Sequence, residues 1–299
     1  MDVYLFRKDK FGRVILPIIM KSNLIYPCIW FDGRAKEAAD LYCSVFNNSA
    51  VTYENPTVVI MESNGQKFMF LNGGPEFTLN PSISFYVICE TEQEIDNFYK
   101  KLIVGGSELM PFDKYDWSKK YVWLQDKFGV NWQLSYGGME KIVQKFTPVL
   151  MFTERIAGKA EQAFRFYTSI FEGSEIIGIM RYSKGDNDTE GTVKHAEFTL
   201  GGQQFMAMDS SMMHRFSFNE AVSFVIECET QEEIDYYWGR LTFCGEEVQC
   251  GWLKDRFGVS WQIVPKVLYE LMNDRSRSER VTKAFLQMKK FDIEKLLKA

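Results

Sequence analysis

The sequence predicts an α+β fold made of four βαβββ modules, arranged as two tandem copies of one domain. Three observations lead to this prediction. Long motifs recur in the same order in the two halves of the chain. Each half alternates amphipathic helices with strand-like runs. Several of these runs follow one another across short turns, which is typical of antiparallel strands and argues against a doubly wound parallel sheet.

Two long matches define the internal repeat. The motif that starts at Cys89 recurs from Cys228, and the string WLQDKFGVNWQ from Trp123 recurs as WLKDRFGVSWQ from Trp252. The chain is therefore expected to have four parts: an N-terminal extension over residues 1–23, a first domain over 24–145, a second domain over 146–265 and a C-terminal helical tail over 266–299.

The elements of the first module can be assigned in order. A strand is expected over residues 24–31, a continuous apolar run. A helix follows, because Ala38, Tyr42 and Val45 share one face at helical spacing. Three further strands are expected at residues 50–54, 57–62 and 67–71, with the Asn64-Gly65 dipeptide as a hairpin turn.

The second module repeats this order. Thr91 and Glu94 form a capping box at the start of its helix, and the second copy keeps the box as Thr230 and Glu233. The strands of this module are expected at residues 83–89, 108–112, 121–125 and 132–136.

The ends of the chain have no counterpart in the repeat. Residues 1–20 are either an added hairpin around Asp9–Gly12 or an extension upstream of a start at Met20. The tail combines basic side chains with apolar residues at helical spacing. Such a helix usually packs its apolar side on its own domain, although a basic amphipathic helix can also bind a membrane or a partner.

Composition and charge exclude several classes of function. The chain has 299 residues, with 35 Lys and Arg against 40 Asp and Glu and a net charge of −5, so an overall basic footprint for nucleic acid is absent. The most apolar early run is short and contains Pro17, which argues against a membrane-spanning helix. The six cysteines lack Cys-x-x-Cys spacing, which favours buried free thiols. We therefore expect a cytoplasmic protein without nucleic-acid or membrane partners.

Histidine is scarce, and this scarcity limits the chemistry. His195 and His214 are the two histidines of the chain, so a site that needs several His ligands is excluded. His195 lies in an expected strand, at the position that Val58 occupies in the first copy. His195 and Glu197 are the candidate catalytic residues, and a structural role for His195 is the alternative. His214 is expected in a solvated loop.

The four modules resemble the vicinal oxygen chelate superfamily, which contains glyoxalases, bleomycin resistance proteins and dioxygenases. Three segments are similar to its PhnB-like subgroup, often labelled 3-demethylubiquinone-9 3-methyltransferase: Pro27–Asp32, Asn80–Phe85 and Cys250–Gln262. The resemblance covers nearly everything after residue 23. It implies that the two modules of each domain close a cupped, mainly antiparallel sheet around a pocket.

Enzymes of that superfamily hold a divalent metal with His and Glu side chains from the first, fourth, fifth and eighth strands. The resemblance places the first-strand position on Pro27 and Pro148, the fifth-strand position near Ser82 and Ala221, and the last-strand position on Gln133 and Gln262. Proline cannot ligate through its side chain, and glutamine is a weak neutral ligand. We therefore expect no metal and no cofactor, and nothing in the sequence resembles a nucleotide-type loop for S-adenosylmethionine.

The first functional hypothesis is a metal-free protein that binds a small organic ligand in a cupped pocket. Its candidate ligand-binding residues are Trp30, Trp132, Gln133, Trp261 and Gln262. Alternation places one member of each Trp–Gln pair on the concave side, and the resemblance favours the glutamine; a core role for the tryptophans is an equal alternative. The second hypothesis is an atypical isomerase, lyase or transferase that uses His195 or Glu197. The third is a structural or regulatory module, monomeric with an internal pseudo-dimer.

Overall fold

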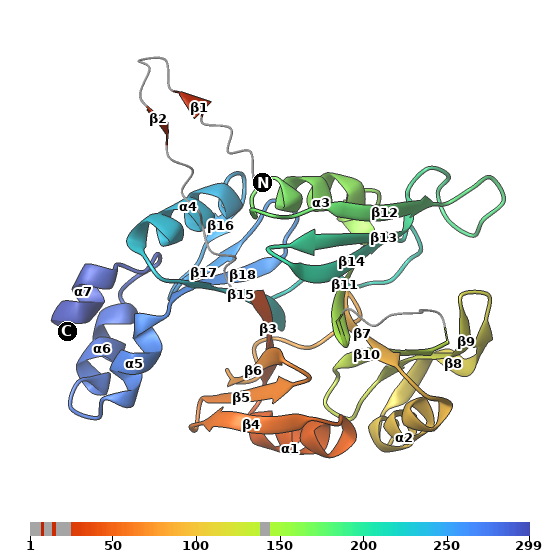
Figure 1. Cartoon of the computed structure of the whole chain (residues 1–299), viewed down its shortest axis with the longest axis horizontal. Coiled ribbons are helices and arrows are strands. Elements are labelled where there is room, and N and C mark those ends of the chain that lie inside the picture. The colour runs from red at the N-terminus through yellow and green to blue at the C-terminus, as the bar shows by residue number, and fades with distance from the viewer. Residues whose placement is uncertain (1–6, 9–13, 16–24, 138–143) are drawn as a thin grey trace, which may run out of the picture.

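The computed structural model describes residues 7–8, 14–15, 25–137 and 144–299, and shows two eight-stranded sheets (Figure 1). The first module contains β3 (Ile25–Phe31), α1 (Ala35–Val45), β4 (Ser49–Glu54), β5 (Val58–Ser63) and β6 (Gln66–Asn72). The second contains β7 (Ile83–Cys89), α2 (Glu92–Leu102), β8 (Ser107–Tyr115), β9 (Ser118–Gln125) and β10 (Asn131–Tyr136). These elements lie within a few residues of the predicted ones.

The second half repeats the pattern, as the sequence predicts. The third module contains β11 (Phe146–Phe152), a 3-10 turn (Glu154–Ile156), α3 (Ala160–Thr168), β12 (Ile176–Arg181), β13 (Val193–Leu200) and β14 (Gln203–Asp209). The fourth contains β15 (Val222–Cys228), α4 (Gln231–Leu241), β16 (Glu246–Glu247), β17 (Trp252–Lys254) and β18 (Ser260–Pro265). The α+β class and the four modules are confirmed.

The modules combine across the two halves of the chain. Sheet I has the order β16-β17-β18-β15-β3-β6-β5-β4, so it joins the first and fourth modules. Sheet II has the order β12-β13-β14-β11-β7-β10-β9-β8 and joins the second and third modules. The sequence-based expectation that both modules of one repeat share a sheet is therefore corrected. β3 pairs with β15 and β11 pairs with β7, both antiparallel, while two pairs in each sheet are parallel.

The helices cover one face of each sheet, which we call the helix-bearing face. Helices α1 and α4 pack on sheet I, and α2 and α3 pack on sheet II. In Figure 1, α1 and α2 lie side by side at one end of the molecule and α3 and α4 lie at the other. The main hydrophobic core fills the space between the sheets and their helices. We call the opposite face of each sheet its outer face.

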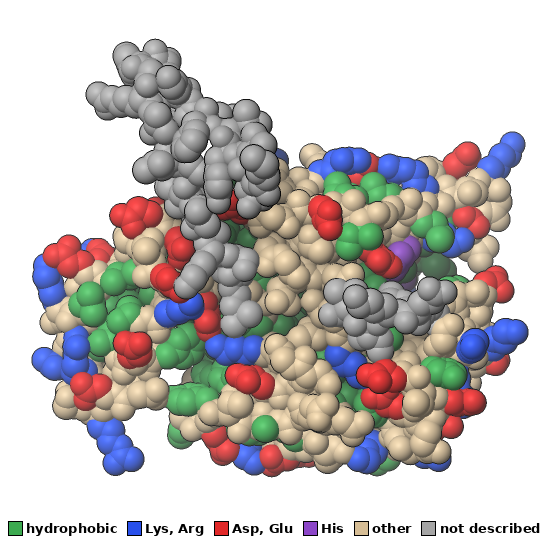
Figure 2. All heavy atoms as spheres, viewed as in Figure 1, with side chains coloured by type: hydrophobic (Ala, Val, Ile, Leu, Met, Phe, Trp, Pro, Cys, Tyr) green, Lys and Arg blue, Asp and Glu red, His purple; other side chains and the backbone are tan. Residues whose placement is uncertain are grey.

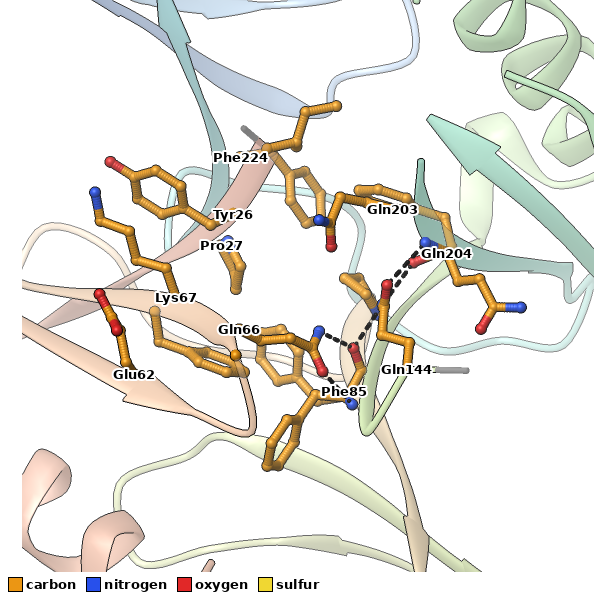
Figure 3. Close-up of a pocket in the computed structure, with 16 residues that line it drawn as sticks. Tyr26, Pro27, Glu62, Gln66, Lys67, Phe85, Gln144, Gln203, Gln204 and Phe224 are labelled. Atoms are coloured by element: carbon orange, nitrogen blue, oxygen red, sulfur yellow. Dashed lines mark hydrogen bonds between the residues drawn. The ribbon is translucent and has the colours of Figure 1, made fainter. Parts of the chain in front are cut away.

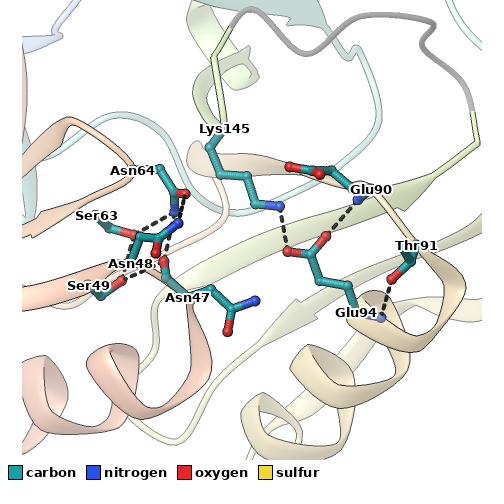
Figure 4. Close-up of polar contacts among 9 residues, drawn as sticks. All are labelled: Asn47, Asn48, Ser49, Ser63, Asn64, Glu90, Thr91, Glu94 and Lys145. Atoms are coloured by element: carbon teal, nitrogen blue, oxygen red, sulfur yellow. Dashed lines mark hydrogen bonds and ion pairs between the residues drawn. The ribbon is translucent and has the colours of Figure 1, made fainter.

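Two local signals in the sequence form as predicted (Figure 4). The Thr91 hydroxyl accepts the backbone N–H of Glu94 at 3.1 Å, and the Glu94 carboxylate accepts the backbone N–H of Glu90 at 2.6 Å. The same carboxylate binds the Lys145 ammonium at 2.7 Å, which ties the second module to the start of β11. Asn64 takes a positive φ of 50° in the predicted hairpin turn, a conformation that asparagine tolerates.

The ends of the chain add short elements to this frame. Strands β1 (Arg7–Lys8) and β2 (Val14–Ile15) pair antiparallel, as expected for a hairpin; the remaining residues up to 24, Met20 included, lie outside the described part. The tail forms α5 (Val267–Asn273), α6 (Ser278–Phe285) and α7 (Ile293–Lys298) and packs on its own chain. In the described part, no helix has the length and apolar character to span a membrane. Acidic and basic side chains alternate over the face shown in Figure 2.

Candidate ligand-binding face

Strand alternation places Trp132 and Trp261 on the helix-bearing faces, where both side chains are fully buried. Each indole N–H donates to a buried carboxylate at 2.9 Å, Trp132 to Asp126 and Trp261 to Asp255. Their assignment as ligand-binding residues is therefore corrected to a core role.

The two buried aspartates organise equivalent corners of the core. Asp126 also accepts the hydroxyl of Tyr42, and Asp255 accepts that of Tyr167, each at 2.7 Å. Backbone N–H groups of the following turn bind the second carboxylate oxygen in both places. Burial raises the pKa of Asp126 and raises the pKa of Asp255 to about 6. The WLxDxFGVxWQ string is thus a folding motif, because its Asp and second Trp bond to each other.

Gln133 and Gln262 lie on the outer faces, as the resemblance implies. Their Nε2 atoms donate to Ser84 Oγ at 2.8 Å and to Ser223 Oγ at 2.9 Å. Gln133 also accepts the Tyr121 hydroxyl at 2.8 Å. Both amides are therefore held in place by hydrogen bonds within their own sheet.

The expected first-strand metal positions need a correction. Pro27 and Pro148 lie on the helix-bearing side of β3 and β11, because each pairs with a core phenylalanine of the next strand. The neighbouring outer-face residues are Cys28 in sheet I and Val149 in sheet II. Burial raises the pKa of the Cys28 thiol to about 12, so the thiol stays protonated at neutral pH.

The outer-face donors do not fit the divalent metal that the superfamily resemblance implies. Sheet I presents Cys28, Met69, Ser223 and Gln262 at the relevant positions, and sheet II presents Val149, Met206, Ser84 and Gln133. Hydroxyl, thioether, amide and protonated thiol groups are weak ligands, whereas Mg²⁺ is held mainly by carboxylate oxygens and Zn²⁺ by imidazole nitrogens, thiolates or carboxylates. Among the described residues, no three His, Cys, Asp or Glu side chains form a group that could hold a metal ion.

The outer face of sheet II carries an aromatic cluster that is separate from the main core. The buried members are Tyr121, Trp123 and Met151. Half-buried neighbours pack against them: Tyr86, Met110, Tyr115, Met208 and Phe216. The Trp117 ring is 53% exposed and lies 5.7 Å from the Tyr121 ring. This cluster is the candidate ligand-binding face.

Two buried polar atoms on this face lack a hydrogen-bond partner among the described residues. They are Trp123 Nε1 and Thr147 Oγ1. Both residues belong to one row across the sheet, because Trp123 pairs with Gln133, Gln133 with Tyr86, and Tyr86 with Thr147. A buried donor without a partner costs about 1–3 kcal/mol.

His195 and Glu197 lie on the same face of sheet II. Nε2 of His195 is 3.1 Å from Oε1 of Glu197, and this hydrogen bond lowers the pKa of the Glu197 carboxyl. Strand register places His195 beside Met208 and Glu197 beside Met206. The predicted acid–base residues therefore adjoin the aromatic cluster. His214 lies in the loop after β14, where its Nε2 is 2.7 Å from Ser210 Oγ.

Trp30 lies on the outer face of sheet I, at the position that Met151 occupies in sheet II. Its ring packs edge-on against Phe77 at 5.0 Å and Trp252 at 6.1 Å. Its indole N–H donates to the carbonyl of Gly74 at 2.7 Å. The sequence-predicted site residues thus divide between two separate outer faces and the core.

A cavity of about 160 Å³ lies between the two sheets (Figure 3), and its lining includes Pro27, Phe85, Pro148 and Phe224. The amide of Gln66 bonds to the backbone N–H and carbonyl of Phe146 on this rim. Gln144 bonds to the backbone of Gln204 in the same way. The glutamines at the rim of the cavity therefore join the two halves of the chain.

Sequence reasoning missed Tyr121 and Trp123 as site residues. Their alternate spacing in a strand already places both side chains on the same face as Gln133, one strand away. The signal was present in the pattern, but the identity of the neighbouring strand was needed to use it.

Comparison with known proteins agrees with this architecture. A family model described as 3-demethylubiquinone-9 3-methyltransferase matches residues 23–135 and again residues 144–264. A Bacillus cereus structure, described as a putative 3-demethylubiquinone-9 3-methyltransferase and PhnB protein, is 37% identical over 38% of this chain and 98% of its own, with a TM-score of 0.36. No curated protein matches the chain.

Glyoxalase I from Zea mays shares the fold over most of the molecule. Its structure covers 85% of this chain and 98% of its own, with a TM-score of 0.57 and 11% identity. At this identity the likeness shows the fold alone. The two matches of the family model span most of the sequence. The chain therefore belongs to the family described as 3-demethylubiquinone-9 3-methyltransferase, whose model it matches twice in tandem.

Proposed function

We propose that this protein binds a flat, mainly apolar small molecule on the outer face of sheet II. The observation that carries the proposal is the aromatic cluster around Tyr121, Trp123 and Met151, which lies apart from the main core. Aromatic rings offer large, rigid contact surfaces, and methionine side chains adapt to differently shaped partners. Trp123 Nε1 and Thr147 Oγ1 have no hydrogen-bond partner among the described residues, which favours a ligand that carries a carbonyl or another acceptor.

The proposal requires neither a metal nor S-adenosylmethionine, although the family description implies methyl transfer. The polar groups of the face are engaged with one another: Gln133 binds Ser84 and Tyr121, and Glu197 binds His195. A large polar cofactor would find few free partners there. The residues do not fit that cofactor, and we derive no step through it.

The direct test is titration of the full chain with 1-acetylnaphthalene, with binding measured by calorimetry and by tryptophan fluorescence. We expect saturable binding and a raised melting temperature. Trp123→Ala should weaken binding at least about tenfold, because it removes ring contacts and the indole donor together.

The equivalent tryptophan of sheet I provides the matched control. Trp252→Ala should leave the affinity unchanged. Equal losses in both variants would contradict the assignment to sheet II. The proposal of ligand binding would also be contradicted if aromatic ketones, quinones and aromatic antibiotics all failed to raise the melting temperature.

A second candidate function is proton transfer by His195. The observation that favours it is the hydrogen bond to Glu197, which orients the imidazole beside Met208 on the candidate face. A bound aryl ketone would then exchange its α-protons with solvent deuterium faster than in buffer. We expect His195→Gln to abolish this acceleration while ligand affinity persists. Absence of acceleration in the unmodified protein would leave binding as the sole function.

We also propose that the protein is a cytoplasmic monomer. All six cysteines are free, which suits a reducing compartment. Each module already has its sheet partner within the chain. Light scattering should therefore give one species near the chain mass of 34.9 kDa, and a stable larger species would contradict this.

A further inference from the structure

The outer face of sheet I carries charged and phenolic groups that sheet II lacks at the equivalent positions. They are Tyr26 on β3, Lys67 on β6 and Glu227 on β15. The internal repeat places Thr147, Gln204 and Ile88 at the corresponding sites of sheet II. All three differences therefore occur together, in one small region of one sheet.

These three groups contact one another closely. The Tyr26 hydroxyl donates to Oε1 of Glu227 at 2.8 Å, and Lys67 Nζ lies 2.5 Å from the same oxygen. Lys67 Nζ also lies 4.3 Å from the centre of the Tyr26 ring. The Glu227 residue is only 6% exposed. An ion pair with a buried carboxylate is costly to form, and sheet II has no such pair at the equivalent positions.

A tyrosine of the C-terminal tail completes the cluster. The hydroxyl oxygen of Tyr269, on α5, lies 2.6 Å from that of Tyr26, and Lys67 Nζ lies 5.0 Å from the Tyr269 ring centre. Burial, together with the nearby Glu227 charge, raises the pKa of the Tyr269 phenol. The phenol therefore stays protonated, with its hydroxyl beside hydrogen-bonding groups and its ring beside a cation.

The tail is also held by contacts that do not involve this tyrosine. The backbone N–H groups of Cys250 and Gly251 donate to carbonyls of Met288 and Lys289, each at 2.7 Å. The Gln231 amide binds backbone groups on both sides of Asp292. Helices α5 to α7 lie together at the side of sheet I (Figure 1). The Tyr269 side chain can therefore be removed while the rest of the tail keeps its docking contacts.

We propose that the outer face of sheet I is a phenol-binding site, and that Tyr269 fills it as a built-in ligand. The inference rests on the proposed function in one respect, since it takes the outer face as the ligand-binding face of both sheets. Each part of a phenol has a matching group: Tyr26 and Glu227 for the hydroxyl, and Lys67 for the ring. The tail thereby confines exogenous ligands to sheet II.

The test is binding of 4-fluorophenol to the full-length Tyr269→Ala variant, measured by fluorine NMR. We expect one saturable site that the unmodified chain lacks, with fluorobenzene bound at least about tenfold more weakly because it cannot satisfy the buried hydroxyl partners. Tyr236→Ala is the matched control, since Tyr236 is also half-buried and bonds a carbonyl, that of Ile170. This control should gain no site.

Two outcomes would overturn the proposal: a folded Tyr269→Ala chain that does not bind 4-fluorophenol, or one that binds fluorobenzene equally well. If that variant does not fold, Tyr269→Phe keeps the ring and loses only the hydroxyl. Its α5 amides should then exchange about tenfold faster than in the unmodified chain, while Tyr236→Phe leaves them unchanged. Unchanged exchange in Tyr269→Phe would overturn the proposal as well.

The two proposals can fail independently. Repeating the 4-fluorophenol titration in a Trp123→Ala background removes the sheet II site and should leave the new site intact. Failure of 1-acetylnaphthalene to bind the unmodified chain would count against sheet II alone. Loss of the new phenol site in the Trp123→Ala background would show that the phenol binds sheet II and would overturn the inference.

Discussion

Trp261 donates its indole N–H to the buried carboxylate of Asp255, six positions earlier in the sequence, at 2.9 Å. The same carboxylate accepts the Tyr167 hydroxyl and two backbone N–H groups.

Asp255→Asn would place amide hydrogens against some of these donors, so we expect it to lower the free energy of unfolding by about 3 kcal/mol. Urea unfolding at pH 7, monitored by fluorescence, measures this change. Asp235→Asn, at an exposed site, should cost less than about 0.5 kcal/mol; similar losses in both would refute the role given to Asp255.

The same carboxyl predicts a pH dependence of stability. Its pKa is about 6 in the folded chain, whereas an unfolded aspartate titrates near pH 4. The folded state therefore binds the proton more tightly, and this contribution to stability is full below about pH 4 and is lost as the pH rises through 6. At about 1.4 kcal/mol per pKa unit, the difference in stability between the unmodified chain and Asp255→Asn should shrink by a few kcal/mol from pH 4 to 7. A constant difference would contradict this.

Gly251 should be far less replaceable than Gly202. Both have a positive φ, 81° and 84°, which disfavours any residue with a Cβ. A Cβ at Gly251 would also lie 2.4 Å from the Phe291 ring, whereas one at Gly202 meets nothing within 4 Å. We expect Gly202→Ala to cost about 1 kcal/mol and Gly251→Ala at least about 3 kcal/mol, because the second must displace the tail. Thermal unfolding of the pair measures the difference, and equal costs would rule out tight packing of Phe291.

Thiol reactivity reports whether the outer face of sheet I is closed. Cys244 is exposed and should react rapidly with Ellman's reagent near pH 8. Cys28 is fully buried, and its raised pKa leaves almost no thiolate, so it should react only on unfolding. Mass spectrometry of the labelled chain distinguishes the two sites. Fast labelling of Cys28 itself would show that this face opens in solution.

The repeated modules and their elements were predictable because the signals are local. The Thr91 capping box, the Asn64-Gly65 turn and the alternation within strands each depend on a few neighbouring residues. The partners of the modules were not predictable in the same way. β3 pairs with β15, but the two halves of the chain have similar strands with similar edges. The repeat therefore does not determine which module pairs with which.

The candidate site was predictable only in part. Alternation predicted that Gln133 and Trp132 lie on opposite faces of the sheet. In the structure Gln133 lies on the outer face and Trp132 lies in the core. The aromatic cluster depends on which strands lie side by side, so Trp123 and Met151 could not be joined from spacing alone. The role of Tyr269 depends on where a non-repeated helix docks, for which the other copy offers no guide.

The exchange of modules between the two halves has a consequence for folding. Ile29 on β3 pairs with Val222 on β15, so the centre of sheet I closes only after the chain has been synthesised past residue 222 of 299. Such distant pairings slow folding, since a long loop must close before its contacts form. Neither repeat can complete a sheet by itself. The two halves, produced as separate polypeptides, should therefore remain incomplete alone and regain a native fold when mixed.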